Sequence, residues 1–255
     1  MEYSAAVHLG LATTAALTAV AAVAGCIDAI AGGGGLLTLP ALLSAGVPAP
    51  LALGTNKGQS VFGSGAATLR FARAGRLTWR RSWPSFVAGF AGSLGGAIAV
   101  SQIDAAALKP LIIALLCAAA ALVLVPRPAS TRVATRPLAT AIGIALVVGA
   151  YDGFFGPGTG TLLIVGYMWL LGEAADTASA NAKVVNFASN LAAVAWFGAR
   201  GKILWAVSLP MAVGQFVGAL IGAQFVLLRG GGLVKLAAVA MSLAMVAKLT
   251  YGLLA

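Results

Sequence analysis

Apolar residues dominate this chain in runs long enough to cross a membrane, and short polar or glycine-containing stretches separate the runs. About 20 apolar residues span the hydrocarbon core of a bilayer as a helix. No stretch sustains the period-2 alternation of transmembrane β-strands. Run length, read against helix breakers, predicts helices near 8–31, 36–46, 51–72, 84–101, 108–125, 137–155, 160–171, 175–198, 205–228 and 233–254.

Two of these segments, 36–46 and 160–171, are too short to span a bilayer. Each follows a glycine-rich stretch, "AGGGGLLTLP" at 31–40 and "FGPGTGTLL" at 155–163, and each precedes a helix that begins with polar residues. Interrupted apolar segments of this kind are typical of broken or re-entrant helix pairs. We therefore expect one such pair in each half of the chain.

The two halves match in order along the sequence. "GCIDAIAGGGG" (25–35) matches "GAYDGFFGPGTG" (149–160), "TNKGQSVFGS" (55–64) matches "NAKVVNFASN" (181–190), and "AGRLTW" (74–79) matches "RGKILW" (200–205). The pattern predicts an all-α polytopic membrane protein with about 8–10 membrane segments and two homologous repeats. The repeats are residues 1–126 and 137–255, and a basic cytoplasmic loop at 127–136 joins them.

Composition and charge agree with a membrane protein. Hydrophobic residues make up 60% of the chain and charged residues 9%, and the net charge of +10 lies mostly in short loops. This distribution indicates topology rather than nucleic-acid binding, and it makes 73–81 and 127–136 cytoplasmic. The remaining basic pairs, Arg200 with Lys202 and Arg229 with Lys235, balance each other, so charge does not decide between parallel and inverted repeats. The N-terminus carries no cleavable leader pattern, and we expect a multi-pass protein of the bacterial inner membrane.

Five ionisable residues fall deep within predicted spans, and four of them form two repeat-related pairs. These four are Asp28 with Asp152 and Lys57 with Lys183, whereas Lys248 near the C-terminus fits a snorkelling side chain. A charge inside a membrane costs at least a few kcal/mol, so each paired residue is a candidate functional residue. No Cys or His spacing predicts a metal site, and no cofactor is expected.

Polar side chains follow each lysine along one helical face. Lys57 is followed by Ser60 and Ser64 at i+3 and i+7, and Lys183 is followed by Asn186 and Asn190 at the same spacing. We call these two sets of side chains the polar stripes. Asn56, Gln59 and Asn181 lie beside them. Ammonium, hydroxyl and amide groups together make a donor-rich surface that suits a small anion. The alternative is polar contact between helices, which needs no charge.

The glycine stretches supply a second set of donors. A helix broken inside the membrane frees backbone N–H groups, and the N-terminus of the next half-helix attracts anions. The candidate residues of the two breaks are Gly33, Gly34 and Gly35 in the first and Gly158, Thr159, Gly160 and Thr161 in the second. The alternative is that these glycines only permit close helix packing.

Asp28 and Asp152 fit two roles, which the sequence does not separate. They could balance the charges of Lys57 and Lys183, or one of them could bind and release a coupling proton. A carboxylate facing an anion repels it unless it is protonated. Proton-coupled anion transport is therefore physically natural.

With these residues in view, the pattern "DAIAGGGGLLTLPALLSAGVPAPLALGTNK" and "DGFFGPGTGTLLIV…ANAKVVNFASN" resembles the sulfite exporter TauE/SafE family of bacterial permeases. The resemblance covers about residues 10–250. It implies a plasma-membrane carrier that exports sulfite, sulfonates or related organic anions, with the glycine breaks, Asn56–Lys57 and 181–190 lining the site. A homodimer is a further open expectation for the assembly.

Other function classes fit less well. An intramembrane enzyme acting on lipid phosphate needs a general acid/base set, yet the only histidine is His8 and no acidic cluster exists. The chain is therefore not expected to be an enzyme. A carrier for another small organic anion and an anion channel stay as alternatives.

Overall fold

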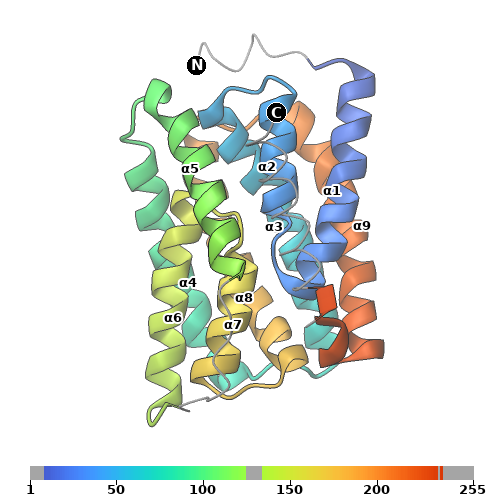
Figure 1. The fold of residues 1–255 in the computed structure, drawn as a ribbon, viewed down its shortest axis with the longest axis vertical. Coiled ribbons are helices and arrows are strands. Elements are labelled where there is room, and N and C mark those ends of the chain that lie inside the picture. The colour runs from blue at the N-terminus through green and yellow to red at the C-terminus, as the bar shows by residue number, and fades with distance from the viewer. Residues whose placement is uncertain (1–8, 125–133, 235, 238–255) are drawn as a thin grey trace.

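The computed structural model describes residues 9–124, 134–234 and 236–237, and side chains at 109 and 116–124 are outside the description. The described part is helical and holds no β-strand. Its helices are α1 (Leu11–Ala31), α2 (Gly35–Ser44), α3 (Ala49–Arg73), α4 (Trp79–Val100), α5 (Ala105–Leu124), α6 (Pro137–Phe154), α7 (Thr159–Leu170), α8 (Ala175–Ala199) and α9 (Trp205–Arg229) (Figure 1). The all-α prediction is confirmed.

Most predicted helices agree with the structure to within a few residues, and α4 is the main exception. The sequence places its start at Pro84, but the helix begins at Trp79 and includes Pro84. A proline this close to a helix start removes only one backbone hydrogen bond, so the helix tolerates it. The predicted helix 233–254, with Lys248, lies almost wholly outside the described residues.

Several outer helices present apolar side chains to their surroundings. Within the described residues, α1, α4, α6 and α9 are long and apolar enough to cross a membrane. Large apolar residues on these helices are strongly exposed, among them Trp83, Val147, Val213 and Leu228. Such a surface is stable against lipid tails and not in water. The chain is an all-α membrane protein.

The central helices are α3 and α8, which carry the polar stripes and pack against each other. Around them α1 packs along α9, α6 packs along α4, and α9 and α4 contact α3 and α8 respectively. The outer pairs approach closely through glycines: a Cβ on Gly218 would lie 1.9 Å from Ala22 O, and one on Gly153 would lie 1.9 Å from Ser93 O. Small residues therefore hold each outer helix against its partner, as in other membrane bundles.

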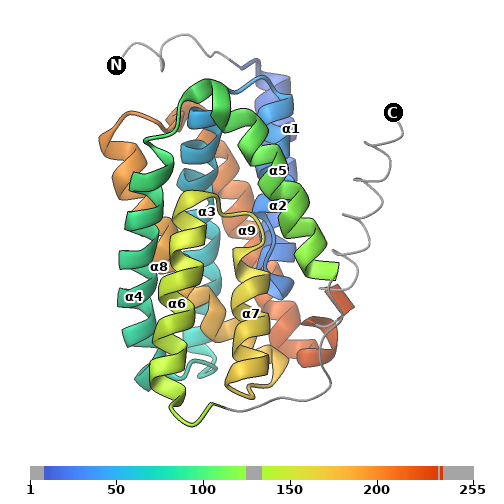
Figure 2. The same ribbon diagram turned by 60° about the vertical axis from the view of Figure 1, so that its left-hand side comes forward.

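The two broken pairs enter the molecule from opposite ends. In Figures 1 and 2, α1 runs inward from one end and α2 returns to it, whereas α6 runs inward from the other end and α7 returns there. As a result α3 and α8 run in opposite directions, and the halves have an inverted arrangement. We call the end with the α3–α4 connection the 74–78 end and the end with the α8–α9 connection the 200–204 end.

This arrangement decides between parallel and inverted halves, which the count of basic residues in the sequence left open. Because α6 and α7 return the chain to the 74–78 end, Arg200 and Lys202 lie at the other end. The end of α9, with Arg229, lies at the 74–78 end. The common ancestry of the two halves stays a prediction.

Candidate functional site

The two helix breaks meet in the middle of the molecule. A Cβ on Gly32 would lie 2.4 Å from the Cα of Gly160, so the two backbones touch there. Gly32, Gly156 and Gly158 have φ values of 69°, 102° and 86°, which other L-residues rarely adopt. The glycines of both stretches are therefore needed for the breaks themselves and for their contact.

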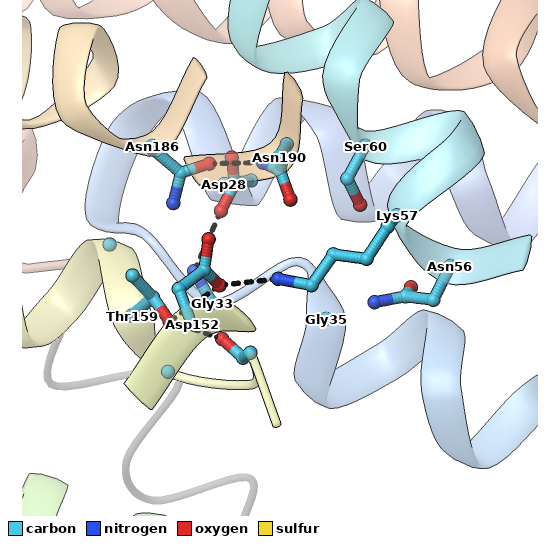
Figure 3. A pocket seen from close by; sticks show the side chains of 13 residues that line it. Asp28, Gly33, Gly35, Asn56, Lys57, Ser60, Asp152, Thr159, Asn186 and Asn190 are labelled. Carbon is cyan, nitrogen blue, oxygen red and sulfur yellow. Dashed lines mark hydrogen bonds and ion pairs between the residues drawn. The ribbon is translucent and has the colours of Figure 1, made fainter. Parts of the chain in front are cut away.

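Two buried ion pairs join the halves at this point. Lys57 Nζ lies 2.6 Å from Asp152 Oδ1, and Lys183 Nζ lies 2.8 Å from Asp28 Oδ2. Each lysine thus pairs with the aspartate of the other half. Figure 3 shows Lys57 reaching from α3 to Asp152 on α6. The pairing compensates four charges that would be costly to bury alone.

The Asp28 carboxylate caps the half-helix α2. Its Oδ1 accepts hydrogen bonds from Gly33 N (3.0 Å) and Gly34 N (3.2 Å), and its Oδ2 accepts from Lys183. These backbone N–H groups are the donors that the sequence assigns to an anion. In this structure the chain's own carboxylate takes that place.

The Asp152 carboxylate has a different set of partners. Thr159 Oγ1 donates to its Oδ1 at 2.8 Å, and Ser189 Oγ donates to its Oδ2. Ser189 was not among the predicted site residues, because the matching position in the first half is Gly63, which has no side chain. Its spacing of three residues from Asn186 is the signal that could have found it.

A small polar cavity of about 20 Å³ lies where the breaks and the central helices meet. This is space for about one water molecule. Both halves line it, through Asp28, Gly33, Gly35, Asn56, Lys57, Ser60, Asp152, Gly156, Gly158, Thr159, Gly160, Asn186 and Asn190 (Figure 3). The described residues contain no group of three or more His, Cys, Asp or Glu side chains that could hold a metal ion.

Two asparagines in the cavity wall have their amide oxygens occupied by neighbouring donors. Asn56 Oδ1 accepts from Thr38 Oγ1 (2.5 Å) and Gln59 Nε2 (3.1 Å), and Asn186 Oδ1 accepts from Asn190 Nδ2 (2.9 Å). In Figure 3 the NH₂ groups of both residues point into the cavity. The wall thus presents donors beside the Lys57 ammonium.

Five further predicted residues lie directly behind the cavity wall. Lys183 is fully buried against Asp28, and Gly34 donates its N–H to the same carboxylate. Thr161 Oγ1 donates to Ala31 O at 3.0 Å, which ties the second break to the end of α1. Gln59 supports Asn56, and Ser64 accepts from Asn190 Nδ2 at 3.4 Å. These residues hold the wall in place.

Asn181 lies away from the cavity, at the 74–78 end. Its Oδ1 accepts from Thr78 N (3.0 Å) and Ser82 Oγ (3.1 Å), and its Nδ2 donates to Glu173 (3.0 Å). Arg81 forms an ion pair with Glu173 at 2.5 Å. Burial raises the pKa of the Glu173 carboxyl, although the Asn181 amide and the Arg81 guanidinium oppose the rise. The structure therefore groups Asn181 with a network that joins the 74–78 connection to the start of α8.

Comparison with known proteins places the chain among membrane transporters. The family model described as "Sulfite exporter TauE/SafE" matches residues 17–249. A "Probable membrane transporter protein" of Haemophilus influenzae is 40% identical over 95% of this chain and 96% of its own length. "Probable membrane transporter protein ORF9" of Sinorhizobium sp is 38% identical over 91% of this chain and 90% of its own length.

A third relative, "Probable membrane transporter protein YfcA" of Escherichia coli K12, is 38% identical over 91% of this chain and 87% of its own length. No solved structure matches the chain. The family and these relatives are named as transporters and not as enzymes. Their names confirm the expectation that this chain is not an enzyme.

Proposed function

The chain belongs to the sulfite exporter TauE/SafE family, and from this premise we propose that it is a secondary active transporter of a small sulfur-containing anion. Sulfite or an organosulfonate is the expected substrate. The transporter exports the anion across the bacterial inner membrane and couples its movement to protons. Its ligands are the anion and the lipid bilayer, and its function requires no cofactor or nucleic acid.

The observation that carries this proposal is the donor-rich wall around Lys57. The ammonium lies in the cavity between the two breaks, and the NH₂ groups of Asn56 and Asn186 point into the same space. Hydrogen bonds from charged donors are the strong ones, and several neutral donors around one cation suit an oxyanion. Sulfite and sulfonate oxygens are acceptors of this type.

The size of the cavity indicates how transport proceeds. Space for about one water molecule is too small for sulfite, so the anion enters only when the halves move apart and Lys57 separates from Asp152. Inverted halves that meet at a central site are the usual basis of alternating access in secondary transporters. In the described structure the space beside Lys57 is therefore too small for the anion.

Flux measurements in liposomes test the site. Purified protein should move sulfite, and the double variant Lys57→Ala/Lys183→Ala should abolish this flux because both cations are lost. Removal of a charged hydrogen-bond donor weakens binding on the order of tenfold to a hundredfold. The double variant leaves Asp28 and Asp152 without partners, so Lys57→Gln/Asp152→Asn provides a charge-balanced test that keeps hydrogen bonds.

The matched control is Arg136→Ala, which removes an exposed cation outside the site. Sulfite flux should be unchanged in this variant, and thermal unfolding in detergent should show that all variants are folded. Wild-type flux in the charge-balanced variant would refute the assignment of the site.

A ligand screen tests the substrate class. Sulfite, thiosulfate, sulfate, sulfoacetate and carboxylate analogues should each be added to the wild-type protein, because a ligand that binds only the folded state raises its stability. We expect the largest thermal shift with a sulfur oxyanion. A larger shift with a carboxylate would favour the alternative of an organic-anion carrier.

A further inference from the structure

The two central aspartates differ in the kinds of groups that surround them. All hydrogen-bond partners of Asp28 among the described residues are N–H donors: two backbone amides and the Lys183 ammonium. An N–H group can donate to a carboxylate but cannot accept a hydrogen bond from a carboxylic acid. A proton added to Asp28 would therefore face donors only, which favours the ionised form at all times.

Asp152 is bonded to two hydroxyl groups as well as to Lys57. A hydroxyl can donate or accept, depending on how its proton is turned. Ser189 Oγ lies 3.0 Å from Asn186 O, and Thr159 Oγ1 lies 2.5 Å from Gly156 O. Each hydroxyl can thus turn its proton to a backbone carbonyl and accept a hydrogen bond from a protonated Asp152. No side chain needs to move.

The two lysines also differ in their access to the cavity. Lys57 lines it, whereas Lys183 lies behind Asp28 with no exposed side-chain surface. A substrate anion in the cavity would meet Lys57 and would displace Asp152 from it. The Lys183–Asp28 pair can stay closed while this happens.

From these contacts, and on the premise of the proposed function, we infer that Asp152 binds the coupling proton as the substrate anion replaces it on Lys57, while Asp28 stays ionised on Lys183. One proton and one monovalent anion enter the cavity together. The summed charge of Lys57, Asp152, proton and anion is then zero, as it is in the empty pair. The inference predicts electroneutral transport of one proton per monovalent anion, so export requires an outward anion gradient larger than the inward proton gradient.

Other groups around Asp152 are compatible with this role. Lys57 faces it from α3, and α7 and α8 contribute the two hydroxyls. Asp28 lines the same cavity from α1, where Lys183 balances its charge. On α4, Ser93 Oγ donates to Ser189 O at 2.6 Å. Tyr151 on α6 donates its O–H to Pro157 O at 2.7 Å, so it is a neutral neighbour.

Two reciprocal variants test the inference in proteoliposomes that contain a pH-sensitive dye. Wild-type protein should move about one proton per monovalent anion. Asp152→Asn should exchange labelled anion across the membrane with a proton ratio near zero. Asp28→Asn, if it folds, should keep the wild-type ratio even where its rate is lower. Proton movement at the wild-type ratio in Asp152→Asn, or its loss in Asp28→Asn with transport retained, would overturn the inference.

A binding measurement covers the case in which one variant does not transport. Calorimetry of the binding of an organosulfonate that stays monovalent at neutral pH, in buffers of different ionisation enthalpy, gives the number of protons taken up with the anion. Uptake should fall from about one to zero in Asp152→Asn and should not fall in Asp28→Asn, and the opposite pattern would contradict the assignment. A wild-type protein that neither binds nor moves sulfite or sulfonates would instead refute the proposed function.

Discussion

The two ends of the molecule fasten their helices with the same geometry but with different chemistry. At the 74–78 end, Asn181 Oδ1 accepts from Thr78 N at 3.0 Å. At the 200–204 end, Thr55 Oγ1 accepts from Leu204 N at 3.0 Å. A serine one turn later adds a second bond at each end, Ser82 to Asn181 (3.1 Å) and Ser208 to Thr55 O (3.4 Å).

The difference lies in the side chains next to these bonds. The 74–78 end has the Arg81–Glu173 ion pair, whose glutamate side chain is only 5% exposed. The matching positions at the 200–204 end are Val207 and Val47, which are 3% and 2% exposed and lie in one apolar cluster. Next to these bonds, one end thus has a charged network and the other an apolar contact.

This contrast teaches how similar halves can differ in the forces that hold their ends together. A charged network can exchange its hydrogen bonds for water when its end opens, so its closure depends on pH and salt. An apolar contact loses a hydrophobic contribution that neither variable changes much. The basic loops predict that the 74–78 end is cytoplasmic, and on that prediction we expect pH sensitivity on the cytoplasmic side.

The largest effect is expected when the charged network loses its cation. Arg81→Ala leaves the Glu173 carboxylate buried beside Asn181 without a counter-charge, which costs about 3 kcal/mol, the low end for a buried pair. In thermal unfolding this corresponds to a Tm lower by roughly 6–12 °C. The loss should shrink at acidic pH, because a protonated Glu173 needs no cation.

The control for this variant is Arg80→Ala, which removes an exposed arginine from the same turn of α4. Its Tm should stay within a degree or so of the wild type, as is usual for exposed substitutions. Equal losses in the two arginine variants would mean that the network does not hold this end closed.

A smaller loss is expected for Asn181→Ala. The variant leaves the Thr78 N–H without its acceptor and removes the amide that donates to Glu173, at a cost of about 2 kcal/mol. Thermal unfolding measures the loss. Because Asn181 lies outside the cavity wall, sulfite affinity should be unchanged, and weaker binding at full stability would return Asn181 to the substrate site.

Asn181 also shows what the sequence could and could not predict. The matched stretches 55–64 and 181–190 place Asn181 opposite Thr55, and Asn56 opposite Ala182. Asn181 was predicted to lie in the site because it is an asparagine, like Asn56. The alignment of the two stretches instead gives Asn181 the position and the role of Thr55. A shift of one residue turns a side chain by about 100° around a helix, so it faces a different neighbour.

The helices, the breaks and the four central charges were predictable because their signals are local. An apolar run, a glycine cluster or a buried charge has a cost that the chain shows without its partners. The partner of each charge was not predictable in this way. The pairing of Lys57 with Asp152 depends on the inverted packing of the halves, and the count of basic residues left that packing undecided.

The 200–204 end should respond less than the 74–78 end to the equivalent change. Thr55→Val keeps the shape of the side chain and leaves the Leu204 N–H without its acceptor, which costs about 1 kcal/mol. No ionised group is uncovered, so the loss in Tm should be the same at acidic and neutral pH. A loss that grows with pH would mean that a titrating group depends on this hydrogen bond.

The smallest expected effect, and the one that isolates the titrating group, is that of Glu173→Gln. The glutamine can still accept from the Asn181 amide, and the lost pair with the partly exposed Arg81 is worth at most about 1 kcal/mol. Burial raises the pKa of Glu173 above its ordinary value of 4.5. At a pH between 4.5 and the pKa of the folded state, the folded state therefore binds more protons than the unfolded state. This contribution to stability is present below pH 4.5 and is lost as pH rises through the folded pKa. Thermal unfolding across that window should show a fall in Tm for the wild type that is absent from Glu173→Gln, and identical slopes would assign the pH dependence to another group.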